Sequence, residues 1–239
     1  MAVYVYAITA RDHPCRLDGA TGVGARAAPV RVLSTPQLRA VVSDIDEQIR
    51  PKRRDVTAHQ EVQNRLMADG TALPLQFGYT APDDDTVLQV LTEREAEYRT
   101  ALDRVQGCAE YNVKAARDEE SILRDVLADT PQARRLNDEI RAGSQDPRLP
   151  LELGRLVADE VQVRRADAAA RLVQELAPLA REHSVHQPVG ETDFLNLSLL
   201  VAREDEEALR TAHARLSRDD GSGVELRLTG PLPPYSFVP

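Results

Sequence analysis

The chain has 239 residues, with 30 Lys and Arg, 39 Asp and Glu, and a formal net charge of −9 at pH 7. Phosphate backbones are bound by clustered basic side chains, so this acidic balance argues against a nucleic-acid-binding protein. The two cysteines, Cys15 and Cys108, give no disulfide framework and no Cys/His metal spacing, which favours a reducing compartment. The start of the chain lacks the cationic and apolar regions of a signal peptide, and no segment is apolar enough to span a bilayer. We therefore expect a soluble cytoplasmic protein.

The first elements of the chain are strands. Residues 2–9 are apolar on both alternating faces, which predicts a strand that is central in its sheet or covered on both sides. The glycine-rich loop 11–29 is followed by another strand signal and not by a helix, so a turn is favoured over a phosphate-binding loop. Two more strands are predicted over 30–33 and 38–45, on either side of a Ser-Thr-Pro turn.

Two charged segments are interpreted as solvated structure. The stretch 46–55 contains the basic pentapeptide RPKRR, which in an acidic protein indicates an exposed loop more than a nucleic-acid contact. Three aspartates at 83–85 precede a helix predicted over 86–105. Acidic residues at a helix start offset the positive end of the helix dipole, and no spaced calcium-ligand loop follows them. Helix capping is therefore the favoured role.

The stretch 55–80 organises the first half of the chain. One buried helical face is predicted from residues at intervals of three and four: Val56, His59, Val62 and Leu66. Gly70 is expected to end this helix in the left-handed conformation. A short strand is predicted from residues that alternate around Pro74: Leu73, Leu75 and Phe77. A proline restricts such a strand to a sheet edge or a strand start.

A second series of elements follows Gly107. A strand is predicted over 108–116, helices over 118–127, 131–142 and 151–180, strands over 185–189 and 194–202, a helix over 204–216 and a strand over 224–228. This is the β-α-β-β-α-β order of a ferredoxin-like unit, in which helices cover one face of an antiparallel sheet. Close packing or a helical hairpin is expected within the alanine-rich longest helix and its predecessors.

The predicted fold class is therefore α+β with two domains. Residues 1–107 are expected to form a modified ferredoxin-like α/β sandwich. Residues 108–228 are expected to form a ferredoxin-like domain with a long helical insertion, hairpin- or coiled-coil-like, at 118–181. A Pro-rich tail, 229–239, completes the chain.

The tail leaves two interpretations open. Its prolines prevent a helix and keep it out of a central strand. It also carries apolar surface that is costly to leave in water. The tail either packs on its own domains, at a small entropic cost because prolines restrict the free chain, or docks a partner protein. The residues that would bind such a partner are Pro233, Pro234, Tyr235 and Phe237.

The residue pattern predicts no catalytic, cofactor-binding or metal site. His59 lies on an apolar helix face without a nucleophile or second histidine at a partner spacing, which favours a core histidine over a general base or ligand. His183 and His186 are three residues apart, but they are expected to straddle a helix end and a strand, with no third ligand nearby. Cys108 is interpreted as a small buried hydrophobic residue.

Several segments carry a resemblance to a known family. The pattern HQEVQNRLMADGTALPLQFGYT begins at His59 and contains Leu73, Pro74, Phe77 and Gly78. The chain also begins with the strand VYVYAIT, contains CAEYNVK from Cys108, and ends with GPLPPYSFV. Together these segments resemble the GvpF/GvpL family of gas vesicle proteins over essentially the full chain. Leu232 stands where members often carry Trp, and Gln76 where an Arg is common.

The resemblance implies a minor structural or accessory gas vesicle protein without enzymatic activity or a cofactor. Such proteins accompany the small, hydrophobic, GvpA-type major shell protein and are thought to contact it and other accessory Gvp proteins. The resemblance also implies two domains with ferredoxin-like parts, a gas vesicle or cytoplasmic location, and a role in vesicle nucleation or assembly. Neither nucleic acid nor membrane is an expected partner. The alternative is a small-molecule enzyme or ligand-binding protein, because ferredoxin-like scaffolds host many functions.

Overall fold

The computed structural model describes residues 1–46, 49–218 and 223–238, and it divides into two compact units. The N-terminal unit contains Met1–Glu110 and Pro231–Pro239, and the C-terminal unit contains Tyr111–Gly230. The sequence placed the boundary at 107 and treated 229–239 as a separate tail. The structure instead divides the chain inside strands β6 (Cys108–Arg117) and β9 (Val224–Leu232) and assigns the end of the tail to the N-terminal unit.

Some residues of the predicted segments lie outside the described residues. Residues 47–48 belong to the charged stretch 46–55, residues 219–222 to the predicted domain 108–228, and residue 239 to the tail. Within the described part of the chain, no helix has the length and apolar character needed to cross a membrane.

An antiparallel five-stranded sheet forms the centre of the N-terminal unit. The strands pair in the order β2-β3-β1-β4, and β5 also pairs with β1. Their bounds are β1 Val3–Ala10, β2 Arg31–Ser34, β3 Leu38–Asp44, β4 Ala72–Pro74 and β5 Thr80–Ala81. Strand β1 is almost entirely buried, as its two apolar faces predicted. β2 and β4 are edge strands, and Pro74 lies in β4, where a missing N–H is tolerated.

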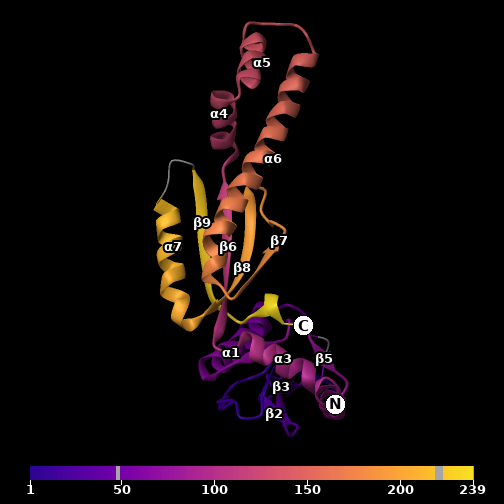
Figure 1. Ribbon diagram of the computed structural model, residues 1–239. Helices are drawn as coiled ribbons and strands as arrows, with labels where there is room; N and C mark the ends of the chain where they lie inside the picture. The colour runs from indigo at the N-terminus through magenta and orange to yellow at the C-terminus, as the bar shows by residue number, and fades with distance from the viewer. Residues whose placement is uncertain (47–48, 219–222, 239) are drawn as a thin grey trace. The chain divides into compact units, whose positions relative to one another are not determined.

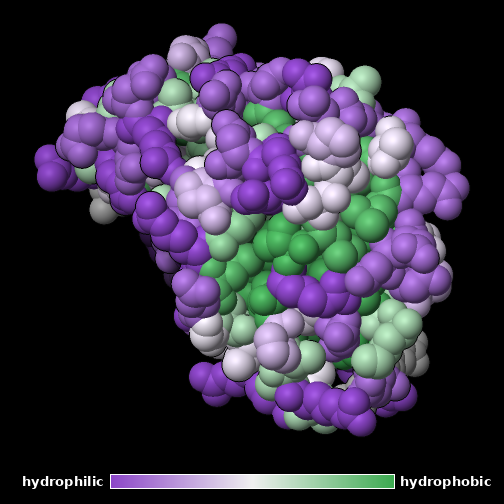
Figure 2. Space-filling view, turned by 90° about the horizontal axis from the view of Figure 1, so that it is seen from below, coloured by the Kyte–Doolittle hydropathy of each residue, from purple (hydrophilic) through white to green (hydrophobic). Residues whose placement is uncertain are grey.

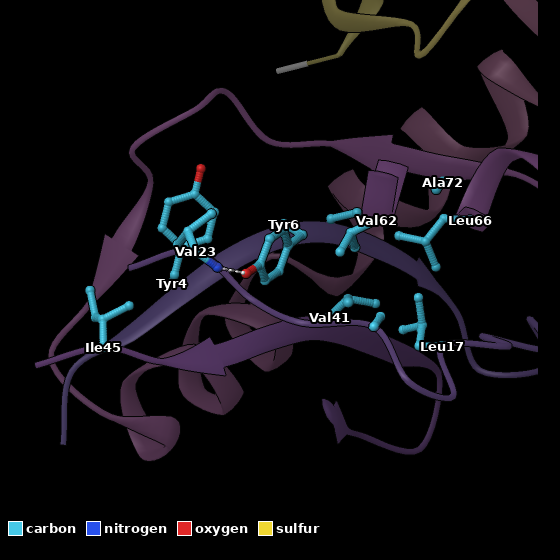
Figure 3. Close-up of a cluster of buried hydrophobic side chains, with 11 residues drawn as sticks. Tyr4, Tyr6, Leu17, Val23, Val41, Ile45, Val62, Leu66 and Ala72 are labelled. Atoms are coloured by element: carbon cyan, nitrogen blue, oxygen red, sulfur yellow. Dashed lines mark hydrogen bonds between the residues drawn. The ribbon is translucent and has the colours of Figure 1, made fainter. Parts of the chain in front are cut away.

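The core of this unit lies where α1 (Arg53–Asp69) meets the tyrosine-bearing face of β1 (Figure 3). Tyr6 is fully buried at its centre, with Val62 and Leu66 of α1 packed in the same cluster. The Tyr6 hydroxyl accepts a hydrogen bond from the Val23 amide at 2.9 Å and lies 2.8 Å from the Ser43 hydroxyl. The glycine-rich loop is therefore anchored to the sheet through a buried phenol and does not form a phosphate cradle.

The buried face of α1 differs from the predicted one. Val56 is 39% exposed, whereas Asp55 is buried and accepts a hydrogen bond from the Gly24 amide at 2.9 Å. The hydrogen bond replaces the water that the carboxylate loses, so the helix can turn this acidic residue inward. The predicted left-handed end at Gly70 is also wrong, because its φ of 165° is extended backbone. A side chain at Gly70 would instead approach the His13 ring, at 3.1 Å from Cδ2.

The predicted helix over 86–105 is two helices. α2 (Asp84–Glu93) and α3 (Glu95–Val105) meet at Arg94. Asp83 caps α2 by accepting a hydrogen bond from the Thr86 amide at 2.8 Å, which confirms the capping role of the acidic run. The strand predicted over 73–77 is shorter than expected, since β4 ends at Pro74.

The C-terminal unit contains a four-stranded sheet in the order β7-β8-β6-β9. The strands are β6 Cys108–Arg117, β7 Glu182–His186, β8 Asp193–Ala202 and β9 Val224–Leu232. The helices are α4 Glu119–Asp129, α5 Pro131–Arg141, α6 Arg148–Leu176 and α7 Glu206–Arg218, with short 3₁₀ turns at Ala177–Leu179 and Arg203–Asp205. The chain therefore contains two sheets, each accompanied by helices. β9 extends beyond the predicted 228, and its edge position accommodates Pro231.

The long helix α6 has two different environments within its unit. Its C-terminal half crosses one face of the sheet, and its N-terminal half lies beside α4 and α5 (Figure 1). Ile122, Val126 and Ala133 form a small core there, against which apolar residues of α6 pack, including Leu156 and Val157. Helices α4, α5 and α6 therefore pack on one another, through residues of α6 that precede its alanine-rich stretch.

Candidate functional site

The Pro-rich tail packs on the N-terminal unit and forms one wall of a polar cluster there. Pro233, Pro234 and Phe237 are buried, with Phe237 only 4% exposed, and Tyr235–Phe237 forms a short 3₁₀ turn. Of the two interpretations of the tail, packing on its own unit is the one that this structure contains. Partner binding through these four residues stays a prediction.

His59 connects the tail to the sheet. Its Nδ1 lies 2.9 Å from the Tyr4 hydroxyl on β1, and its Nε2 lies 2.9 Å from the Tyr235 hydroxyl of the tail. Tyr6 and Tyr235 stack against the imidazole, and Phe77 meets it edge-on. We call these residues the histidine cluster: Tyr4, Tyr6, His59, Phe77 and Tyr235.

The hydrogen-bond partners assign the tautomer of His59. The Tyr4 hydroxyl accepts the Gly78 amide hydrogen at 2.9 Å, so its own proton is directed to His59 Nδ1. His59 Nε2 then carries the ring proton and donates it to Tyr235. Burial lowers the pKa of His59 to about 4 and raises the pKa of Tyr235 to about 12, so both groups are neutral at pH 7.

A buried carboxylate holds the next residue of the tail. Glu110, near the start of β6, is 5% exposed. It accepts hydrogen bonds from the Ser236 amide at 2.9 Å and from the Ser236 hydroxyl at 2.7 Å. Two donors on one buried carboxylate replace much of its lost hydration. His59 and Glu110 therefore hold two neighbouring residues of the tail.

The residues that carried the resemblance lie around this cluster. Leu73 and Pro74 are buried in β4, which pairs with β1, and Phe77 contacts the His59 ring. Gly78 has φ +98°, a conformation that favours glycine, and its amide reaches Tyr4. The conformation at Gly78 thus helps to fix the tautomer of His59.

The other predicted site residues do not gather. His183 and His186 both lie on β7, and a spacing of three on a strand directs them to opposite faces, so they cannot form a metal pair. His186 Nε2 lies 3.2 Å from the Ser198 hydroxyl. Across the described ranges, no group of three or more His, Cys, Asp or Glu side chains has metal-ligand geometry. Cys108 is half-exposed at the start of β6, not buried as expected.

Sequence reasoning missed Tyr4, Gln63 and Glu110. A tyrosine in a strand with two apolar faces was a usable signal, because a buried hydroxyl requires a partner. Gln63 follows His59 by one helical turn, and its amide donates to the Tyr6 carbonyl at 2.6 Å. No signal in the sequence pointed from Glu110 to Ser236, which are 126 residues apart.

The N-terminal unit also carries a separate apolar hollow of about 390 Å³ beside edge strand β2. Leu17 and Ala20 are its buried residues, and Cys15, Val30 and Val32 are half-buried around them. Figure 2 looks from below at the side of this unit where β2 lies and shows apolar surface gathered there inside a polar rim. We call this feature the β2 hollow.

Comparison with known proteins identifies the family of this chain. Residues 2–239 match the family described as gas vesicle synthesis protein GvpL/GvpF. The chain belongs to the GvpL/GvpF family. It is 42% identical to gas vesicle protein F of Streptomyces sp. (strain CB03234) over the full length of both chains. It is 30% identical to gas vesicle protein L2 of Halobacterium salinarum, over 88% of this chain and 81% of the relative.

Solved structures of GvpF share the fold. The crystal structure of GvpF from Anabaena sp. PCC7120 superposes with a TM-score of 0.85 at 21% identity, covering 99% of this chain and 97% of the other. GvpF from Microcystis aeruginosa gives a TM-score of 0.79, covering 99% and 98%. The mixed α/β fold with two antiparallel sheets is therefore that of GvpF.

Family membership assigns this chain a role in gas vesicle formation. The GvpL/GvpF family consists of structural and accessory proteins of gas vesicles and not of known enzymes. Within the histidine cluster, both nitrogens of the imidazole are engaged in hydrogen bonds inside the N-terminal unit. The histidine cluster holds the tail on the N-terminal unit.

Proposed function

We propose that this protein is a minor accessory component that binds the GvpA-type major shell protein during nucleation or assembly of the gas vesicle. Other accessory Gvp proteins are further proposed partners. Family membership supports a gas vesicle role, and the β2 hollow is the observation that supports a binding role. Apolar surface at the edge of a sheet suits a hydrophobic polypeptide, which could bury side chains in the hollow and pair its backbone with β2.

The β2 hollow is a better candidate surface than the tail. The prolines and Phe237 of the tail are already buried in the N-terminal unit, so they offer little apolar area to a partner. Truncation after Thr229 would remove part of β9 together with the buried Phe237. Lost binding by such a truncation would therefore reflect lost folding as readily as lost contact.

Point substitutions test the proposal more sharply. The full-length protein with an affinity tag is mixed with purified shell protein, and capture is compared for the parent chain, Val32→Glu and Val185→Glu. Val32 is half-buried on edge strand β2, and Val185 is 59% exposed on edge strand β7 of the other sheet. The two variants thus place the same charge on an edge strand, and only one of them alters the hollow.

We expect the parent chain and Val185→Glu to capture the shell protein and Val32→Glu to lose most of the capture. Circular dichroism must show that Val32→Glu keeps its melting temperature. If it unfolds, the exposed Pro29→Glu at the rim of the hollow replaces it. No capture by the parent chain would refute shell-protein binding, whereas equal capture by a folded hollow variant would refute only the assignment to this surface.

A further inference from the structure

The C-terminal unit contains an arginine-lined cavity of about 610 Å³. It lies among α6, α7 and β9 and includes the end of β6. Five arginines line it: Arg117, Arg164, Arg165, Arg171 and Arg215. Among the described residues that line it, two carry carboxylates, Asp167 and Glu175. In a chain with a net charge of −9, such a local excess of cationic side chains is unexpected as mere surface composition.

The ion pairs of the cavity leave part of this positive charge uncompensated. Arg117 pairs with Asp125, and Arg215 pairs with Glu175 at 2.5 Å. Arg164 pairs with Asp129 at 3.0 Å, and its Nε lies 3.7 Å from Glu160 Oε2. Arg165 and Arg171, by contrast, have no carboxylate at ion-pair distance within the described part of the chain. The only hydrogen bond of the Arg171 side chain to a described residue goes to the Asp167 carbonyl, at 3.4 Å.

Several arginines that line the cavity also have a guanidinium nitrogen without a hydrogen-bond partner among the described residues. The Nε atoms of Arg117, Arg164 and Arg165 are buried and form no hydrogen bond with the described residues. The Arg117 side chain is only 13% exposed and that of Arg164 only 25% exposed. Buried donors are normally satisfied in folded proteins, so the described residues around these three arginines meet only part of their hydrogen-bonding capacity.

Apart from Gln174, the remaining described lining is apolar. Phe194 is buried, and Leu172, Leu216 and Leu226 complete this part of the wall. The volume lies within the range of about 300–1,000 Å³ that is usual for small-molecule sites. Planar guanidinium groups bind carboxylates and phosphates through paired hydrogen bonds. The lining thus combines oxyanion donors with an apolar wall.

We propose that this cavity binds an organic oxyanion, a carboxylate or phosphate carried on an apolar body, with Arg165 and Arg171 as its principal charged contacts. The site lies entirely within the C-terminal unit and is separate from the β2 hollow. A failure of shell-protein binding would therefore leave this proposal intact, and a failure of oxyanion binding would leave shell-protein binding intact.

Isothermal titration of the full-length protein tests the proposal with three probes: inorganic phosphate, phenyl phosphate and phenylacetate. We expect saturable binding of at least one phenyl probe, tighter than that of inorganic phosphate because of the apolar wall. The preferred phenyl probe distinguishes a phosphate ligand from a carboxylate ligand. Affinity should fall as salt is raised, since the contacts are charged. No binding of any probe at millimolar concentration would overturn the proposal.

Matched variants on α6 locate the site. Arg165→Gln and Arg171→Gln should each weaken binding by about tenfold or more, because each loses a charge-assisted hydrogen-bond pair. Arg155→Gln removes an exposed arginine of the same helix outside the cavity and should bind like the parent chain. Unchanged melting temperatures show that folding is retained. The assignment would be contradicted if all three variants weakened probe binding equally. It would also be contradicted if neither cavity variant weakened probe binding.

Discussion

The hydrogen bond between His59 and Tyr235 gives a direct measure of how firmly the tail is held. Tyr235→Phe keeps the ring and its stacking on the imidazole but removes the hydroxyl that lies 2.9 Å from His59 Nε2. The ring nitrogen would then be buried without its close acceptor. Gln63 cannot substitute, because the atom that faces Nε2, at 3.4 Å, is its amide nitrogen, itself a donor.

The expected loss follows from this geometry. Leaving one buried neutral donor unsatisfied costs about 1–3 kcal/mol. The half-buried position of Tyr235 admits some water, so we expect about 1–2 kcal/mol. With a urea dependence of about 1–3 kcal/mol per molar, the unfolding midpoint should fall by roughly 0.3–2 M.

Urea unfolding followed by circular dichroism measures this change without a tryptophan, which the chain lacks. Tyr79→Phe is the matched control, because Tyr79 belongs to the same unit and is 50% exposed. Its free energy of unfolding should change by less than about 0.5 kcal/mol, as is usual for substitutions at surface positions. If the urea midpoint of Tyr235→Phe falls no further than that of Tyr79→Phe, the hydrogen bond from His59 does not hold the tail.

Three further predictions concern the same unit. His59 has a pKa of about 4 when folded against 6.5 when exposed, so the unfolded chain binds more protons between these values. The resulting stabilisation is complete above pH 6.5 and is lost as the pH falls toward 4, by up to about 2 kcal/mol between pH 7 and 5. His59→Gln should remove this component of urea stability, and the exposed His183→Gln should keep it; identical pH profiles would contradict it. Gly22→Ala should destabilise by about 1–3 kcal/mol, because its Cβ would lie 2.4 Å from Ser43 Oγ, and an unchanged melting temperature would exclude this clash. Asp83→Ala should cost about 1 kcal/mol through the lost cap of α2, with Asp85→Ala, which removes a neighbouring acidic residue other than the cap, nearly neutral in the same assay.

Local pattern was enough to predict most elements of both sheets and the helices beside them. β1, with two apolar faces, is buried, and the alternation in β6 places Tyr111, Val113 and Ala115 in the core. Periodicity succeeds here because burial on one or both faces leaves a repeated hydrophobic mark on neighbouring residues. The same local reasoning recognised Asp83 as a cap, since a cap is satisfied within three residues.

Local pattern failed where a distant partner changes the cost of burial. Asp55 is polar but buried, because the Gly24 amide donates a hydrogen bond to its carboxylate. The orientation of α1 that buries Asp55 leaves the neighbouring Val56 exposed. The two histidines of β7 were placed across a helix end, and the strand separates them onto opposite faces. Hydropathy records the average preference of a residue and not the hydrogen bonds that tertiary structure provides.

By itself, the sequence determined the family, the α+β character and the existence of a tail too apolar to remain in water. The place of that tail was decided only by tertiary structure, through His59 and Glu110, which are far from it in the chain. The arginine-lined cavity has the same origin, because six elements of the C-terminal unit bring its side chains together: β6, α4, α6, β8, α7 and β9. Residues that meet only after folding leave no period in the sequence, so their shared chemistry becomes visible only in the structure.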